Sequence, residues 1–119
     1  MSATTVLALS IDCADAATLA SFWSQVLGRP VNDGATAEFA AIAATDATAT
    51  GPLLLFHQVP EGKNVKNRLH LDLVNADFEA ETQRLLGLGA TRLNDVDKGD
   101  ARWRTLADPE GNEFDLVAG

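Results

Sequence analysis

Two residues that could do acid–base or metal-binding chemistry alternate with leucines in RLHLDL, residues 68–73. His70 and Asp72 are two positions apart, so on a β-strand both point to one face while the leucines point to the other. An imidazole can serve as a base, a hydrogen-bond partner or a metal ligand. Asp72 can line a site beside it, or it can bond backbone or an arginine in a structural role. The polar face therefore either meets solvent or lines a site.

The other candidates for chemistry are scattered along the chain. His57 lies near the end of an apolar stretch, where exposure at a strand end is the simpler interpretation. Cys13 is the only cysteine, so no internal disulfide can form, and its apolar neighbours favour a buried residue over a reactive thiol. The sequence has no tyrosine, no Gly-x-Ser-x-Gly elbow, no glycine-rich phosphate loop and no Cys-x-x-Cys pair. Tyrosine-based acid–base catalysis is therefore excluded.

Aromatic and basic side chains could form the walls of a binding site. Trp103, Phe39 and Phe56 lie in strand-like stretches, where a core role and a stacking role toward a planar ligand are both open. Arg104 could attract a carboxylate or phosphate, although exposed strand arginines are the commoner case.

The elements that must position these residues begin with an alternating stretch, TVLALSIDCAD, which predicts a strand over 5–15. Asp15 can cap the helix that follows, and Gly28 suits the position after its end. Three strand-like pieces then follow, at 30–33, 36–44 and 51–59.

The second half repeats this order. A strand predicted over 68–74 leads to Asp77 as a helix cap, and Gly89 ends that helix. The sequence DPEG at 108–111 is typical of a tight turn between strands. The three strand-like pieces after the helix are 91–95, 101–107 and 112–117.

The chain is thus predicted to be two copies of a β-α-β-β-β unit in one domain, residues 1–119. Module one spans 5–59, a polar linker 60–67, and module two 68–117. Half a chain of this length cannot bury its own sheet face well, so the two units are expected to pair. Their polar strand faces would then line a shared cleft.

Composition sets limits on partners. The chain has 119 residues, a net charge of −8 and a pI near 4.5. This balance disfavours a nucleic acid or an anionic membrane as partner, whereas a small molecule is compatible with it. The first residues lack the basic start and apolar core of a secretory signal, so a cytoplasmic location is expected.

Three segments, SIDCADAATLASFWSQVLGR (10–29), KNRLHLDL (66–73) and DPEGNEFDLV (108–117), together resemble the vicinal-oxygen-chelate (VOC) superfamily. The likeness is to its glyoxalase-like branch, in the glyoxalase–bleomycin-resistance–dioxygenase family. It covers nearly the whole chain. It implies an α+β fold in which two βαβββ modules form a cupped, partly open mixed sheet with helices on the outer face. Such modules pair within one chain or swap between chains, and a homodimer is expected.

Enzymes of this superfamily hold a divalent metal in the cup, and the resemblance carries over two ligand positions. His70 stands where the fifth-strand ligand is expected, seven residues before the capping Asp77, and Asp115 stands at the eighth-strand position. The first-strand position is Ala8, and the remaining one falls at Leu54 or its neighbour, so neither can bind metal.

Two protein ligands are fewer than the three that a catalytic divalent ion usually receives. His57 is the candidate third ligand if its side chain faces inward. The ion would then be Mn, Fe, Ni or Zn.

Three functions remain open. The favoured one is small-molecule binding with no cofactor required, in which contacts come from Trp103, Phe39, Phe56, Asp72 and Arg104. The alternative is a metal-dependent lyase or dioxygenase-type enzyme that uses His70 and Asp115, with His57 as a further ligand. The third is a metal-free enzyme in which His70 or Asp115 moves a proton as the catalytic residue.

Overall fold

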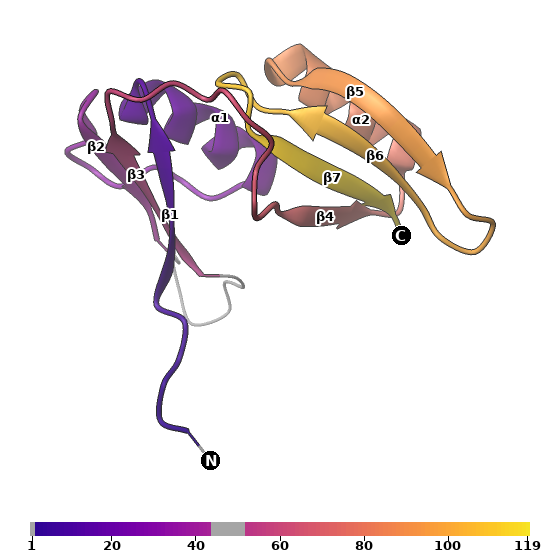
Figure 1. Cartoon of the computed structure of the whole chain (residues 1–119), viewed down its shortest axis with the longest axis horizontal. Coiled ribbons are helices and arrows are strands. Elements are labelled where there is room, and N and C mark those ends of the chain that lie inside the picture. The colour runs from indigo at the N-terminus through magenta and orange to yellow at the C-terminus, as the bar shows by residue number, and fades with distance from the viewer. Residues whose placement is uncertain (1, 44–51) are drawn as a thin grey trace. The chain divides into compact units, whose positions relative to one another are not determined.

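The structure, a computed structural model, describes residues 2–43 and 52–119 (Figure 1). The chain forms two compact units that divide between Gly62 and Lys63, inside the segment predicted as a linker. Each unit combines one helix with one mixed sheet, so the predicted α+β class is confirmed. The predicted strand ends at 44 and 51 lie outside the described residues. Among the residues described, no helix is both long and apolar enough to cross a membrane.

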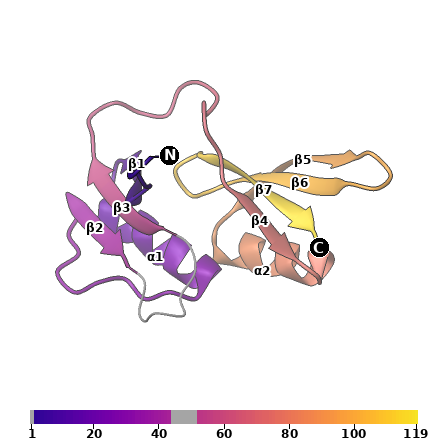
Figure 2. The same ribbon diagram turned by 90° about the horizontal axis from the view of Figure 1, so that it is seen from below.

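The first unit holds strand β1 (Ala8–Cys13), helix α1 (Ala16–Leu27), and strands β2 (Phe39–Ile42) and β3 (Leu53–Gln58). Its strand order is β1-β3-β2, with β3 parallel to β1 and antiparallel to β2. In Figure 2 the helix runs along one face of this sheet.

Both ends of α1 form as the sequence predicts. The side chain of Asp15 accepts a hydrogen bond from the backbone N–H of Thr18 at 3.1 Å, which satisfies one free donor of the first turn. Gly28 ends the helix in the left-handed region at φ 66°. The apolar stripe between these caps packs on the sheet, and the buried residues of this core are Leu19, Phe22, Trp23, Val26, Ile42, Leu54 and Phe56.

The piece predicted as a strand at 30–33 is not one. Asn32 donates a single backbone hydrogen bond to Ala41, at 2.8 Å, and the chain then turns through Gly34 at φ 89°. Pro30 lacks an N–H, and the turn follows too soon for a ladder to extend. This stretch therefore makes one backbone hydrogen bond to β2 rather than a paired strand.

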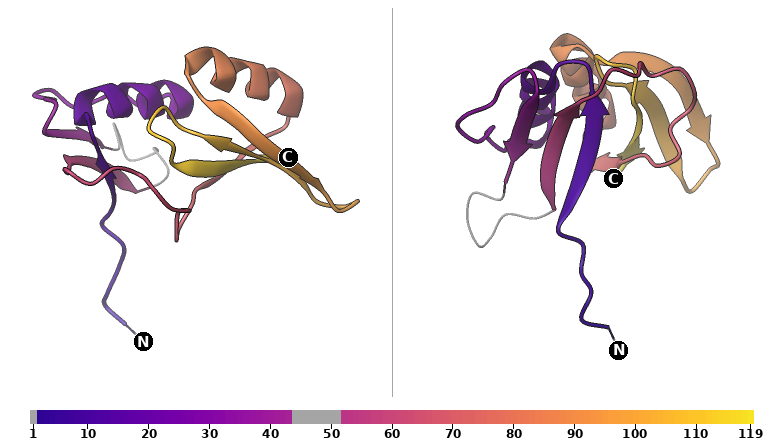
Figure 3. Two further views of the ribbon diagram at one scale, coloured as in Figure 1. Left: turned by 45° about the horizontal axis from the view of Figure 1, so that its top comes forward. Right: turned by 60° about the vertical axis from the view of Figure 1, so that its left-hand side comes forward.

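The second unit has the full β-α-β-β-β order. It runs through β4 (Asp72–Asn75), α2 (Phe78–Leu88), β5 (Thr91–Asp97), β6 (Arg102–Ala107) and β7 (Glu113–Ala118). The strand order is β4-β7-β6-β5, with β4 parallel to β7 and the other pairs antiparallel (Figure 3).

The strand predicted over 68–74 starts later, at Asp72. Asp72 pairs with Asp115 in a parallel ladder and β7 begins at Glu113, so Arg68 and Leu69 have no strand residue opposite them. Just before β4, the Leu71 carbonyl accepts a 2.9 Å hydrogen bond from the Asp115 N–H. His70 therefore lies in the connection just before the strand.

The turn and caps of this unit also form as predicted. Asp77 caps α2 by accepting from the Ala80 N–H at 3.2 Å, and Gly89 follows the helix at φ 121°. In the turn between β6 and β7, Asp108 accepts from the backbone N–H groups of Glu110 and Asn112 at 2.9 and 3.0 Å.

Strand alternation gives this sheet two unlike faces. The face toward α2 buries Leu106, Phe114 and Leu116. The opposite face, called here the distal face, is set by the cross-strand pairs Asp72–Asp115, Val74–Val117, Thr105–Asp115 and Trp103–Val117.

Candidate functional site

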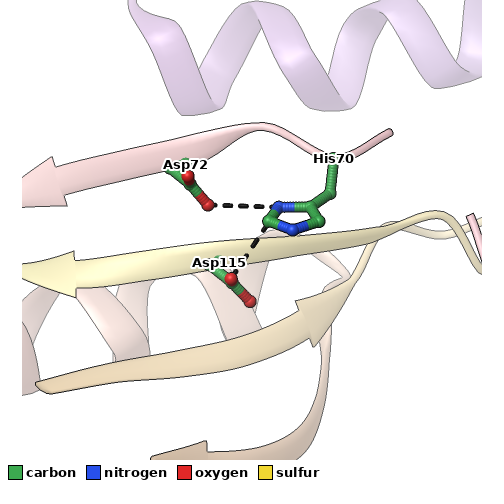
Figure 4. A group of neighbouring side chains, drawn as sticks. All are labelled: His70, Asp72 and Asp115. Atoms are coloured by element: carbon green, nitrogen blue, oxygen red, sulfur yellow. Dashed lines mark ion pairs between the residues drawn. The ribbon is translucent and has the colours of Figure 1, made fainter. Parts of the chain in front are cut away.

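His70, Asp72 and Asp115 converge at the start of the distal face, where β4 and β7 lie side by side (Figure 4). The Nδ1 atom of His70 is 3.1 Å from Asp72 Oδ1 and 3.8 Å from Asp115 Oδ2. The side chains of His70 and Asp72 are 41% and 61% exposed, and that of Asp115 is 15% exposed. The group is thus reachable from solvent, and Asp115 is its least exposed member.

This arrangement favours one form of the neutral imidazole. A proton on Nδ1 can be donated to Asp72 Oδ1, 3.1 Å away, which leaves Nε2 as an unprotonated acceptor. A histidine held in this way can accept a hydrogen bond from a ligand or act as a base toward it.

Thr105, which the sequence did not single out, fixes the carboxylate of Asp115. Its hydroxyl donates a 2.6 Å hydrogen bond to Asp115 Oδ1, while Oδ2 is the oxygen nearer to His70. The cross-strand pairing of Thr105 with Asp115 makes this contact, and pairing between distant strands leaves no local signal in a sequence. One oxygen of Asp115 is therefore oriented by the protein and the other is available to the group.

The distal face also carries apolar side chains next to the polar group. Trp103 is half-buried and pairs with Val117, and Val74 is 69% exposed. Trp103 lies two positions from Thr105 and hence on the same face. The tryptophan and valines supply an apolar surface beside His70, Asp72 and Asp115.

Arg104, predicted as a ligand contact, lies on the other face of the sheet. Its guanidinium is buried under α2, where it donates to Asp95 at 2.8 Å, to Thr82 at 2.9 Å and to Glu79 at 3.3 Å. It also lies over the ring of Phe78, 4.5 Å from the centroid. Its donors are engaged within the unit, which supports a structural role.

The same pairing shifts the ionisation of the partners. Hydrogen bonding from Arg104 is the main cause that lowers the pKa of Asp95 to about 2, and a hydrogen bond from Arg92 lowers it further against the opposing effect of burial. The hydrogen bond to Asp95 in turn raises the pKa of Arg104.

The remaining candidates belong to the first unit. Phe56 is fully buried on the α1 side of the sheet, which supports its core role. Phe39 is 43% exposed and pairs in register with His57 on β3, their rings 5.2 Å apart at centroids. The same histidine pairs with Asp12 of β1, so this face of the first unit holds a second polar and aromatic group.

The donor set of the second unit fits a divalent cation. One donor atom from each of His70, Asp72 and Asp115 lies within 4.8 Å of the others. Ligands about 2.0–2.2 Å from an ion can be at most about 4.4 Å apart, so the observed spacing is close to what one ion requires. A mixed set of imidazole and carboxylates suits Mn, Fe or Zn. Asp72 is thus the candidate third donor in this group, where the family resemblance had offered only His70 and Asp115 in the second unit.

The class of protein follows from the fold together with a family match. The profile of the glyoxalase-like domain matches residues 8–117. The chain belongs to the glyoxalase-like domain family, and the resemblance to the VOC superfamily is confirmed. No curated protein sequence gives a significant match.

Solved structures share this fold. A glyoxalase/bleomycin resistance protein/dioxygenase family enzyme from Burkholderia phytofirmans has 16% identity and a TM-score of 0.71, covering 92% of this chain and 94% of that one. A fosfomycin resistance protein from Listeria monocytogenes, complexed with Mn(II) and a dihydroxypropylphosphonic acid, has 12% identity and a TM-score of 0.76, with coverages of 100% and 92%. A lactoylglutathione lyase from Agrobacterium tumefaciens has 11% identity and a TM-score of 0.64, with coverages of 96% and 92%. At these identities the likeness shows the fold, and it confirms the βαβββ-type arrangement.

Proposed function

We propose that this glyoxalase-like protein binds a small molecule on the distal face of its second unit. The observation that carries the proposal is the convergence of His70, Asp72 and Asp115 beside Trp103. Binding sites commonly combine an apolar surface with a few convergent polar groups, and this face has both.

The polar group suggests what kind of molecule it takes. With the proton on Nδ1 of His70, the accessible atoms are Nε2 and the carboxylate oxygens of Asp72 and Asp115, all of which accept hydrogen bonds. A ligand that carries hydroxyl or amino groups satisfies them, whereas a bare carboxylate would meet two like charges. Trp103 adds a surface on which a planar part of the ligand can stack.

A screen by thermal denaturation tests this proposal. A set of amines, polyols and aromatic alcohols is added to the wild-type protein and to Asp115→Asn. A ligand at 100 times its dissociation constant stabilises by about 2.7 kcal/mol, a readily measured shift. We expect hits that stabilise the wild type and not the variant, while the exposed-loop control Asp100→Asn behaves as wild type. Hits that stabilise all three proteins equally would place binding elsewhere.

The second candidate is a metal-dependent enzyme, and Asp72 is the observation that favours it. The group His70, Asp72 and Asp115 would hold the ion, which would act as a Lewis acid on vicinal oxygens of a substrate when bound. Elemental analysis of protein purified without a tag or chelator tests this directly. About one equivalent of Mn, Fe, Ni or Zn in the wild type that is lost in His70→Ala would support it, whereas metal in neither protein would argue for recognition alone.

We also propose that the protein forms a homodimer. Strands β1 and β4 are edge strands of their sheets within the described residues, and Val74 on β4 is 69% exposed. Exposed edges with apolar side chains favour pairing with another chain. Sedimentation equilibrium distinguishes a dimer from a monomer.

A further inference from the structure

The connection that carries His70 is held to strand β7 at two points. Between Lys63 and Leu71 the chain forms neither helix nor strand. At its far end the Leu71 carbonyl accepts the N–H of Asp115 at 2.9 Å. At its near end the contacts are made by Glu113, two residues earlier on the same strand and on the same face as Asp115.

Glu113 contacts this connection through side chain and backbone. Its carboxylate accepts from Lys63 Nζ at 3.2 Å and from the backbone N–H of Asn67 at 3.3 Å. The side-chain amide of Asn67 donates to the Glu113 carbonyl at 2.9 Å. The side chain of Glu113 is 13% exposed, and Lys63 also donates to the carbonyl of Val65. Lys63 and Asn67 are thus both tied to the first residue of β7.

Apolar packing does little to hold this segment. Val65 and Leu69, its two large apolar side chains before Leu71, are 75% and 84% exposed. Ordering a chain segment costs conformational entropy, which some contact must offset. The polar contacts of Glu113 and Asn67 are the ones that the structure provides for this purpose.

We propose that Glu113 is a positioning residue for His70. With Asn67 fixed at one end and Leu71 at the other, only three residues span the gap, and His70 is the last of them. The contacts of Glu113 with Lys63 and Asn67, called here the clamp, set where the imidazole lies relative to Asp115, which is on the same strand as Glu113. This inference rests on the proposed function, because it gives the clamp the task of preparing a binding group.

The chain offers a direct readout, since it contains two histidines and the other, His57, lies in the first unit. Ring ¹⁵N chemical shifts report which nitrogen carries the proton, and His70→Ala assigns the signals. The proteins compared are wild type, Glu113→Ala, Glu113→Gln and Asn67→Ala. Lys66→Ala, at an exposed residue of the same connection, is the matched control, and Glu61→Ala, just before it, is a second one.

We expect Glu113→Ala to move the His70 ring signals toward those of a free imidazole, with a smaller shift in Glu113→Gln, which keeps one acceptor oxygen. Asn67→Ala should shift them in the same direction, while the His57 signals and the Lys66→Ala and Glu61→Ala spectra stay as in wild type. Affinity for any hit from the screen should fall about tenfold in Glu113→Ala, the lower end of the loss seen when a residue that orients a metal-binding side chain is removed.

Unchanged His70 signals in a folded Glu113→Ala protein would overturn the proposal. Equal shifts of the His70 and His57 ring signals would overturn it as well, because they would mean that the whole protein has lost structure. If Glu113→Ala does not fold, Asn67→Ala decides the question. The ring spectrum needs no ligand. A wild type that binds nothing therefore contradicts the proposed function alone, and an unmoved His70 contradicts the clamp alone.

Discussion

Replacing Thr105 by Val removes one hydroxyl and leaves a β-branched side chain of similar shape on strand β6. The lost interaction is the 2.6 Å hydrogen bond to Asp115 Oδ1. Hydrogen bonds to charged groups contribute about 1.5–3 kcal/mol, and because Asp115 keeps some solvent access we expect a loss near 1.5 kcal/mol. The side chain of Asp115 is 15% exposed, which is the reason for the lower end of this range. Urea denaturation at neutral pH measures the change.

The matched control is Thr91→Val, at an exposed position of the neighbouring strand β5, which should change stability by less than about 0.5 kcal/mol. A double-mutant cycle with Asp115→Ala isolates the pair, because Thr105→Val should cost little once the acceptor is gone. Ligand binding should also be weaker in Thr105→Val, because Asp115 is no longer oriented by the hydroxyl. A variant as stable as Thr91→Val, or a full loss that persists in the Asp115→Ala background, would refute this explanation of the hydrogen bond.

Three further changes test other parts of the structure. Arg104→Lys should lower stability by about 2 kcal/mol, because an ammonium cannot make the hydrogen bonds of a buried guanidinium. The ligand affinity of the folded variant should stay unchanged. Reduced affinity would indicate that Arg104 contacts the ligand. The depressed pKa of Asp95, about 2 against an ordinary 3.8, gives stability that is present above about pH 4 and lost as pH falls toward 2. Asp95→Asn should therefore flatten the acid limb of stability in urea titrations, and an unchanged limb would contradict the pairing. At neither Gly28 nor Gly62 would an added Cβ meet an atom within 4 Å, so the two differ in the positive φ of 66° at Gly28. Gly28→Ala should therefore lower stability by about 1 kcal/mol, whereas Gly62→Ala should be neutral. Equal melting temperatures of the two variants would contradict the backbone-strain explanation.

Local signals predicted the helices well. Asp15 and Asp77 are polar residues directly before apolar stripes. Each accepts a hydrogen bond from the backbone N–H three residues later, as a helix cap does. Gly28 and Gly89 adopt positive φ after the two helices. These features depend on a few neighbouring residues, so a sequence states them directly.

Strand limits were harder to predict, because they depend on the partner strand. His70 alternates with leucines as a strand residue would, yet the ladder between β4 and β7 begins only at the pair Asp72–Asp115. Pro30 and the turn at Gly34 likewise leave the extended piece at 30–33 without a ladder.

The sequence singled out part of the group that the structure brings together. The period-two spacing of His70 and Asp72 predicted that both side chains lie on one polar face, and the structure places His70 Nδ1 3.1 Å from Asp72 Oδ1. Thr105 and Glu113 were missed, because a strand threonine is common and a glutamate after a turn is unremarkable until the register is known. For Arg104 a signal was present: it shares its strand face with Leu106, and an apolar residue two positions away indicates the buried side.

Amide chemical-shift mapping with a hit from the thermal screen tests the central claim most directly. If His70, Asp72 and Asp115 form one binding group, the ligand should shift the amide signals of these residues together with those of Trp103 and Thr105. His70→Ala should weaken the shifts at every one of them. Shifts confined to the first unit, or shifts that persist unchanged in His70→Ala, would contradict the assignment of the binding site to the distal face.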